Sequence, residues 1–130
     1  MFTATTKQMQ TLVLPCCLAL SRLPQARKLI KRYKDDVKYN TVFAWCAVLL
    51  KFLSPGKAGL ESVLAAARKQ NPHTEAYFTG SKAIPKDFPD SYSLGSREEA
   101  ICYAKKLQMA WNRHPVALEW LRRQKASAVG

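Results

Sequence analysis

The sequence predicts an all-α protein of about six helices that pair as antiparallel hairpins. Apolar residues recur at intervals of three and four along nearly the whole chain, and Ser96-Arg97-Glu98-Glu99 is a capping box, which marks a helix start. No segment shows the strict apolar–polar alternation of a half-buried strand. The 130 residues, 48% of them hydrophobic, fit a single domain with its own core.

Four helices are predicted in the first half. One spans residues 8–21, with an apolar stripe of Leu12, Cys16, Ala19 and Leu20, beside Val13 and Cys17. The next begins at Leu23-Pro24, because proline is favoured in a first turn, and its inward face is Ala26, Leu29, Ile30 and Tyr33. Val42–Leu53, capped by Asn40 or Thr41, is apolar almost all round, as in a buried helix. The fourth carries Leu60, Val63, Leu64 and Ala67 and runs to Gln70.

Two further helices and a short one are predicted in the second half. Asn71-Pro72 is a cap with a first-turn proline and opens a short helix that Gly80 ends. Residues 81–95 form an ordered loop whose apolar side chains pack on the helices, namely Ile84, Phe88, Tyr92 and Leu94. Ser96 caps a helix that runs through Trp111, and His114-Pro115 opens the last one, with Ala117, Leu118, Trp120 and Leu121 inward. We expect residues 1–11 and 125–130 to fray.

The charge of the chain is strongly positive. There are 21 Lys and Arg against 9 Asp and Glu, a net charge of +12, which attracts acidic proteins, nucleic acid or anionic membranes. The outward face of the second helix carries four basic residues, Arg27, Lys28, Lys31 and Arg32. Like charges four residues apart cost a few tenths of a kcal/mol in an isolated helix. This basic patch is therefore the candidate partner-binding site, although a plain solvated face has the same pattern.

Several classes of site are not indicated. The four cysteines, Cys16, Cys17, Cys46 and Cys102, contain no CxxC pair and are expected to be buried reduced thiols in a cytoplasmic protein. His73 and His114 each lack a metal-spaced or catalytic partner, so we expect no metal, no cofactor and no catalytic residue. No apolar run is long enough to span a membrane. The basic, acid-free N-terminus leaves a signal peptide or mitochondrial presequence as an alternative.

A weak internal repeat accompanies the helical pattern. Ala26, Ile30 and Tyr33 correspond to Leu60, Leu64 and Ala67 with a constant shift of 34 residues, the period of tetratricopeptide units. Pro72 follows where such a unit has its closing proline. The sequence thus predicts a short tetratricopeptide-like solenoid.

The region Asn71–Leu121 also holds an ordered set of short motifs: Asn71-Pro72-His73, Tyr77, Gly95-Ser96, Glu99-Ala100-Ile101, Tyr103-Ala104, Trp111 and Ala117-Leu118. It resembles the C-terminal helical region of the suppressor of tumorigenicity seven family, and similar tetratricopeptide-like proteins, some of which carry a MYND zinc finger elsewhere. The resemblance implies a helical repeat scaffold without catalytic residues. This chain has neither the membrane spans nor the MYND array of those proteins, so the resemblance implies a truncated or minimal version of them.

These observations favour a non-catalytic protein–protein interaction module whose basic patch binds an acidic protein or peptide. Non-specific nucleic-acid binding through the same patch is the alternative, and exposed apolar ends of a short solenoid would favour self-association. The motif residues are interpreted as structural: Asn71, Pro72, His73, Gly95, Ser96, Glu99 and Trp111. In that role Glu99 serves the cap alone, and Glu99→Ala should cost about 0.5–1 kcal/mol.

Overall fold

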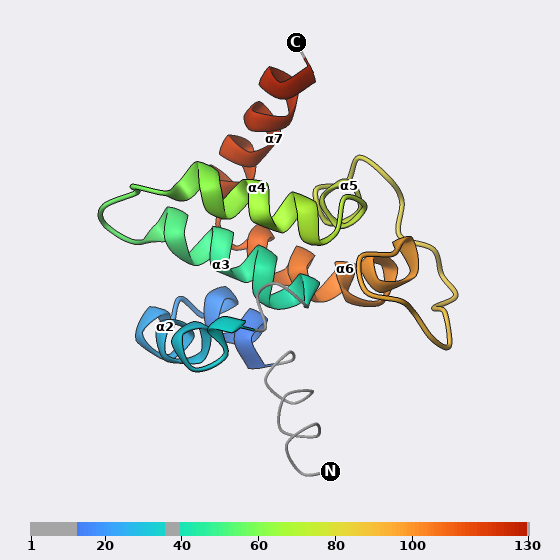
Figure 1. The fold of residues 1–130 in the computed structure, drawn as a ribbon, viewed down its shortest axis with the longest axis horizontal. Helices are drawn as coiled ribbons and strands as arrows, with labels where there is room; N and C mark the ends of the chain where they lie inside the picture. Colours follow the sequence, from blue (N-terminus) through green and yellow to red (C-terminus); the bar gives the residue numbers. More distant parts are fainter. Residues whose placement is uncertain (1–12, 36–39, 130) are drawn as a thin grey trace.

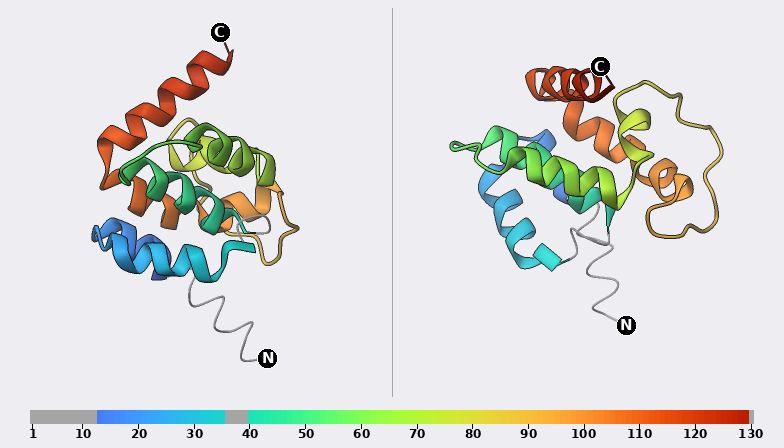
Figure 2. Two further views of the ribbon diagram at one scale, coloured as in Figure 1. Left: turned by 60° about the vertical axis from the view of Figure 1, so that its left-hand side comes forward. Right: turned by 45° about the horizontal axis from the view of Figure 1, so that its top comes forward.

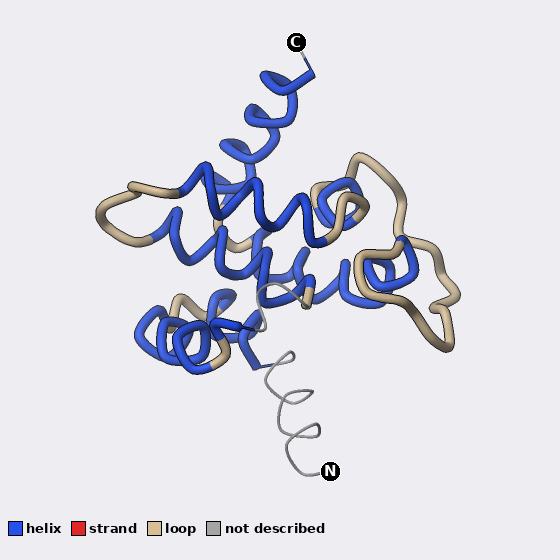
Figure 3. The backbone as a smooth tube through the Cα atoms, in the orientation of Figure 1, coloured by secondary structure: helices blue, strands red, loops and turns tan. Residues whose placement is uncertain are grey.

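A computed structural model describes residues 13–35 and 40–129. All regular secondary structure in these residues is helical, and they contain no strand (Figures 1 and 3). The all-α prediction is confirmed. Residues 13–19 are helical, and six labelled helices follow: α2 (Leu23–Arg32), α3 (Thr41–Leu53), α4 (Leu60–Gln70), α5 (Thr74–Phe78), α6 (Arg97–Asn112) and α7 (Pro115–Val129). The fraying expected at 1–11 and at residue 130 lies outside the described residues, and of 125–129 only the helical backbone is described.

Helix α3 is the centre of the molecule. It contacts α2, α4, α6 and α7, and nine of its side chains are buried, as its nearly continuous apolar sequence predicts. Its start is fixed by Asn40, whose Oδ1 accepts the Val42 and Phe43 amide hydrogens at 2.8 and 3.2 Å. Helix α4 lies beside α3 and is joined to it by the loop 54–59 (Figure 1). The outer turns of α7 extend beyond the other helices (Figure 2).

The aromatic core joins α3, α5 and α6. The ring of Phe78 lies between two buried tryptophans, 5.3 Å from Trp45 on one side and 5.3 Å from Trp111 on the other. Trp120 on α7 packs on Phe52 of α3 at 5.2 Å. Trp111 and Trp120 therefore pack neighbouring helices together, and Phe78 ties the five-residue helix α5 into this core beside its ion pair with Arg68 of α4.

The first described helix is rotated relative to the prediction. Its buried side chains are Leu14, Pro15, Cys17 and Leu18, whereas Cys16 and Leu20, which were predicted to face inward, are exposed, Leu20 by 61%. Residues 12–20 are apolar on every side, so periodicity alone could not select the inward face. The end of this helix is held by the corner between α6 and α7, where His114 Nε2 lies 2.7 Å from the Leu18 carbonyl oxygen.

The loop 81–96 also differs from the prediction. Ile84 is half-buried against Tyr77, Ala100, Ile101 and Ala104, as expected. Phe88, Tyr92 and Leu94, however, are exposed by 50, 42 and 62%. The loop extends to one side of the molecule (Figure 2), and it has too few neighbours there to cover all of its apolar residues.

In the described part of the chain, no helix is both long and apolar enough to cross a bilayer.

Candidate interaction surface

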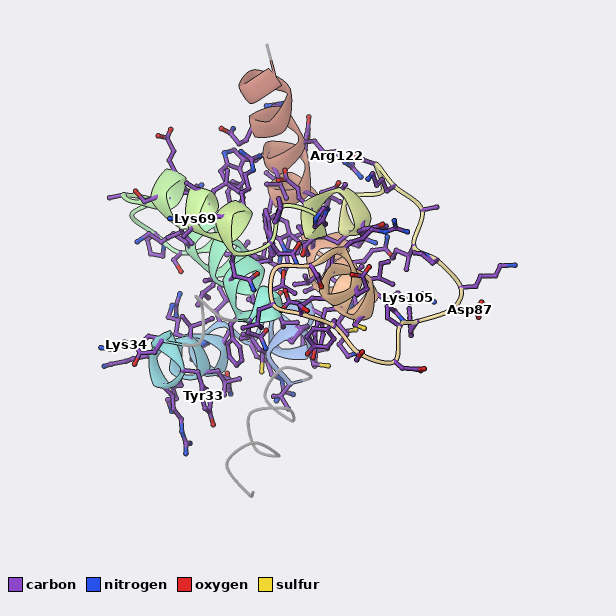
Figure 4. The ribbon with its side chains drawn as sticks, turned by 45° about the vertical axis from the view of Figure 1, so that its right-hand side comes forward. Tyr33, Lys34, Lys69, Asp87, Lys105 and Arg122 are labelled. Atoms are coloured by element: carbon purple, nitrogen blue, oxygen red, sulfur yellow. The ribbon has the colours of Figure 1, made fainter. Side chains whose placement is uncertain are left out.

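The α2 basic face consists of Arg27, Lys28, Lys31 and Arg32. All four side chains are exposed, while Ala26 on the opposite side of the helix is buried and Leu29, Ile30 and Tyr33 are half-buried. The predicted division of this helix into an apolar and a basic side is confirmed. Lys34, which follows the helix, projects outward in the same region (Figure 4).

The charges of the α2 basic face are not neutralised by carboxylates of the described residues. Among the described residues, ion pairs form between Arg68 and Glu75 and between Arg123 and Glu119, both away from α2. The first turn of α2 has no acidic residue. Lys31 and Arg32 stand in the last turn, where positive charge is favoured by the helix dipole. Arg27 and Lys28 lie before the last turn and lack this dipole interaction, so helix stability gives no reason for a cation at either position.

Four of the predicted motif residues meet in a second, buried site, which we call the α4–α6 joint: Asn71, Gly95, Ser96 and Glu99, together with Gln70. Asn71 is fully buried and uses both ends of its amide. Its Oδ1 accepts the amide hydrogens of His73 and Thr74 at 2.9 and 3.2 Å, so it caps the turn before α5. Its Nδ2 donates to the Ser96 carbonyl oxygen and to Glu99 Oε1, both at 2.9 Å.

Glu99 is the centre of the joint and is only 1% exposed. Its Oε1 accepts three hydrogen bonds, from the Gly95 amide at 2.9 Å, Asn71 Nδ2 at 2.9 Å and Gln70 Nε2 at 3.3 Å. The serine half of the predicted capping box is confirmed, because Ser96 Oγ accepts the Glu99 amide hydrogen at 3.1 Å. The glutamate half is wrong by one residue: Glu99 accepts from Gly95, while the Ser96 amide bonds to the Ser93 carbonyl at 3.2 Å.

Gly95 is required by the geometry of the joint. Its φ of +77° lies in the left-handed region, and a Cβ added there would lie 2.9 Å from the Gln70 carbonyl oxygen. The chain can therefore approach the end of α4 closely only because residue 95 has no side chain.

The other motif residues lie apart from this cluster. Pro72 and His73 are exposed on the turn before α5, and Trp111 is in the aromatic core. Sequence reasoning selected Asn71 and Glu99 separately, as caps, but missed Gln70, which shows no signal except that it precedes Asn71.

The cysteines are all unpaired, but they are not all buried. Cys46 is fully buried in α3, where burial raises the pKa of its thiol far above the ordinary value, and burial also raises the pKa of Cys17 and Cys102. The expectation of a buried thiol is wrong for Cys16, which faces solvent.

The described surface includes two shallow clefts. One, of about 400 Å³, is bounded by Trp120 and the first turn of α4, and the other, of about 450 Å³, lies where Leu20 meets the α6–α7 corner beside Arg113. The described residues contain no group of three or more His, Cys, Asp or Glu side chains that could hold a metal ion.

The chain was compared with known proteins in three ways. It matches no family model, no curated protein and no solved structure.

Proposed function

We propose that this protein is a non-catalytic helical interaction module whose α2 basic face binds an acidic protein or peptide. The observation that carries the proposal is the set of four exposed cations on one face of α2, without a carboxylate partner among the described residues. An acidic partner would relieve the like-charge repulsion within this face, which water and salt relieve only in part.

The scaffold part of the proposal is a tetratricopeptide-like stacking of helix pairs, akin to the C-terminal region of the suppressor of tumorigenicity seven family, in a cytoplasmic protein. A solenoid opens from its ends because each repeat contacts mainly its neighbours, whereas a bundle closed around α3 opens as a unit. Native-state hydrogen exchange tests this point. Protection that decreases stepwise from α3 and α4 towards the outer helices supports the solenoid, and uniform protection contradicts it.

The binding site is tested with charge reversal and a fluorescent glutamate-rich peptide, by anisotropy at physiological salt. In the α2 reversal variant, Arg27, Lys28, Lys31 and Arg32 are all replaced by Glu. Because each reversal removes two charges, the net charge falls from +12 to +4. We expect the affinity to fall more than tenfold, since each of the four contacts becomes repulsive.

A matched control separates the site from the total charge. Reversal of four exposed cations elsewhere, Lys69, Lys86, Arg97 and Lys105, also gives +4. If the two variants lose the same affinity, binding depends on net charge alone and the assignment to α2 is wrong.

The alternative, nucleic-acid binding by the same face, is tested with a 20-base-pair DNA duplex in the same assay. A duplex that binds more tightly than the peptide, with affinity that falls steeply as salt rises, would favour the alternative and contradict an acidic protein partner.

A further inference from the structure

A second surface combines exposed aromatic rings with lysines. This loop–α6 face consists of Phe88 and Tyr92 from the loop 81–96 and of Tyr103, Lys105 and Lys106 from α6. The Tyr92 and Tyr103 rings meet edge to face with centroids 5.7 Å apart, and their hydroxyl oxygens are 2.7 Å apart. The ammonium of Lys105 lies 5.7 Å from the Phe88 ring centre, and that of Lys106 lies 5.8 Å from the Tyr103 ring centre.

The aromatic side chains of this face are not used by the core. Phe88 and Tyr92 are about half exposed, although burying a ring is among the largest apolar gains available to a small domain. Phe88 has the Lys105 ammonium beside its ring, and Tyr92 contacts Tyr103, whose own ring lies beside Lys106. Half-exposed rings next to ammonium groups provide two complementary contacts, a flat apolar surface and a positive charge beside it.

We propose that the loop–α6 face binds single-stranded nucleic acid, with bases stacked on Phe88 and Tyr92 and phosphates bound by Lys105 and Lys106. A nucleotide presents a flat base and an anionic phosphate together, which matches this pairing of ring and lysine. A duplex keeps its bases stacked inside and could use only the lysines. An acidic peptide has the charge but lacks the stacking surface.

The charges around the face favour an anion only moderately. Lys86 on the loop adds to Lys105 and Lys106, but Asp87 and Asp90 are exposed on the same loop. Asp87 and Lys105 lie on one side of the molecule and Lys34 near α2 lies on the other (Figure 4). Stacking should therefore supply much of the affinity, and the site is distinct from the α2 basic face.

The test is fluorescence anisotropy with labelled 15-nucleotide oligo(dT) and oligo(U), at low and physiological salt. Phe88→Leu and Tyr92→Leu each remove a ring and keep an apolar side chain, and each should weaken binding about tenfold. Tyr92→Phe removes only the hydroxyl that meets Tyr103 and should bind like the unmodified protein. Weak binding by Tyr92→Phe as well as by Tyr92→Leu would show that the tyrosine pair acts structurally, and would overturn the stacking proposal.

The lysines are tested by the salt dependence. Replacing Lys105 and Lys106 by Gln should flatten the slope of log affinity against log salt by about 1.4, since each phosphate contact on a single strand contributes about 0.7. Thermal unfolding of every variant confirms that the fold is kept. The proposal is overturned if neither oligonucleotide binds, if the duplex binds as well as the single strands, or if the α2 reversal variant removes binding while Phe88→Leu and Tyr92→Leu do not.

Discussion

The α4–α6 joint and the α2 basic face differ in what their polar groups contact. In the joint, a buried carboxylate accepts three hydrogen bonds, and both ends of the Asn71 amide are occupied. On α2, four cations point to solvent and meet no carboxylate of the described residues. Buried polar groups that are hydrogen-bonded within the chain contribute to the fold, whereas exposed cations bound only to water are free to bind a partner.

The comparison makes opposite predictions for mutation. Substitutions in the joint should reduce the free energy of unfolding and should alter binding to α2 only if they unfold the protein. Substitutions on the α2 basic face should weaken binding and leave the free energy of unfolding nearly unchanged. The variants below test that separation.

Glu99→Ala should have the largest effect, a loss of about 2–4 kcal/mol in the free energy of unfolding measured by urea denaturation. This exceeds the 0.5–1 kcal/mol that a cap alone predicts, because the donors on Gly95, Asn71 and Gln70 lose a shared acceptor in a buried site.

Glu98→Ala is the matched control for this change. Glu98 stands in the same first turn of α6 but is exposed, so its removal loses only a dipole interaction of about 0.3–1 kcal/mol. Equal losses for the two variants would show that Glu99 acts only through the helix terminus.

Gly95→Ala should cost about 2–3 kcal/mol, from the left-handed backbone and from contact of the new Cβ with the Gln70 carbonyl oxygen. Gly80→Ala separates the two causes, because Gly80 has a similar φ of +89° and nothing within 4 Å of an added Cβ. We expect Gly80→Ala to cost about 1–2 kcal/mol, the backbone strain alone. If it costs as much as Gly95→Ala, the close approach to α4 is unimportant.

Ser96→Ala should cost about 1 kcal/mol, the usual value for loss of an N-cap. The side chain is near the surface and its loss leaves one amide, that of Glu99, without its acceptor. Ser96→Asp restores an acceptor and adds a negative charge at the helix start, so it should recover most of the stability. A variant with Asp that remains as unstable as the one with Ala would contradict a capping role.

Features set by local chemistry could be predicted from the sequence. The start of α3, predicted at Asn40 or Thr41 and found at Asn40, the proline in the first turn of α2 and the Ser96 cap each depend on residues within one turn of each other. The basic side of α2 followed equally directly, because its apolar and charged residues alternate with a clear helical period.

Features set by contacts between distant segments could not be predicted. Asn71 and Glu99 are 28 positions apart, and nothing in either local sequence reveals that their side chains meet. The inward face of the first helix was wrong because residues 12–20 are apolar on all sides, so only packing selects Leu14 and Leu18 over Leu20. Exposure of Phe88 depends on how far the loop extends from α6, which composition does not determine.

The smallest expected change in stability belongs to the α2 reversal variant, whose free energy of unfolding should stay within about 1 kcal/mol of the unmodified protein. Exposed substitutions usually change stability by less than about 0.5 kcal/mol each, and the two electrostatic contributions here are small. Like-charge repulsion along the helix is exchanged for like-charge repulsion of the other sign, while glutamates at positions 31 and 32 are disfavoured by the helix dipole in the last turn. Urea denaturation at low and at high salt tests whether the difference is electrostatic, because salt screens both contributions and should bring the stabilities of the two proteins closer together. A loss of several kcal/mol that persists in high salt would mean that these side chains support the packing of α2 on α3, and the division between a structural joint and a binding face would then be wrong.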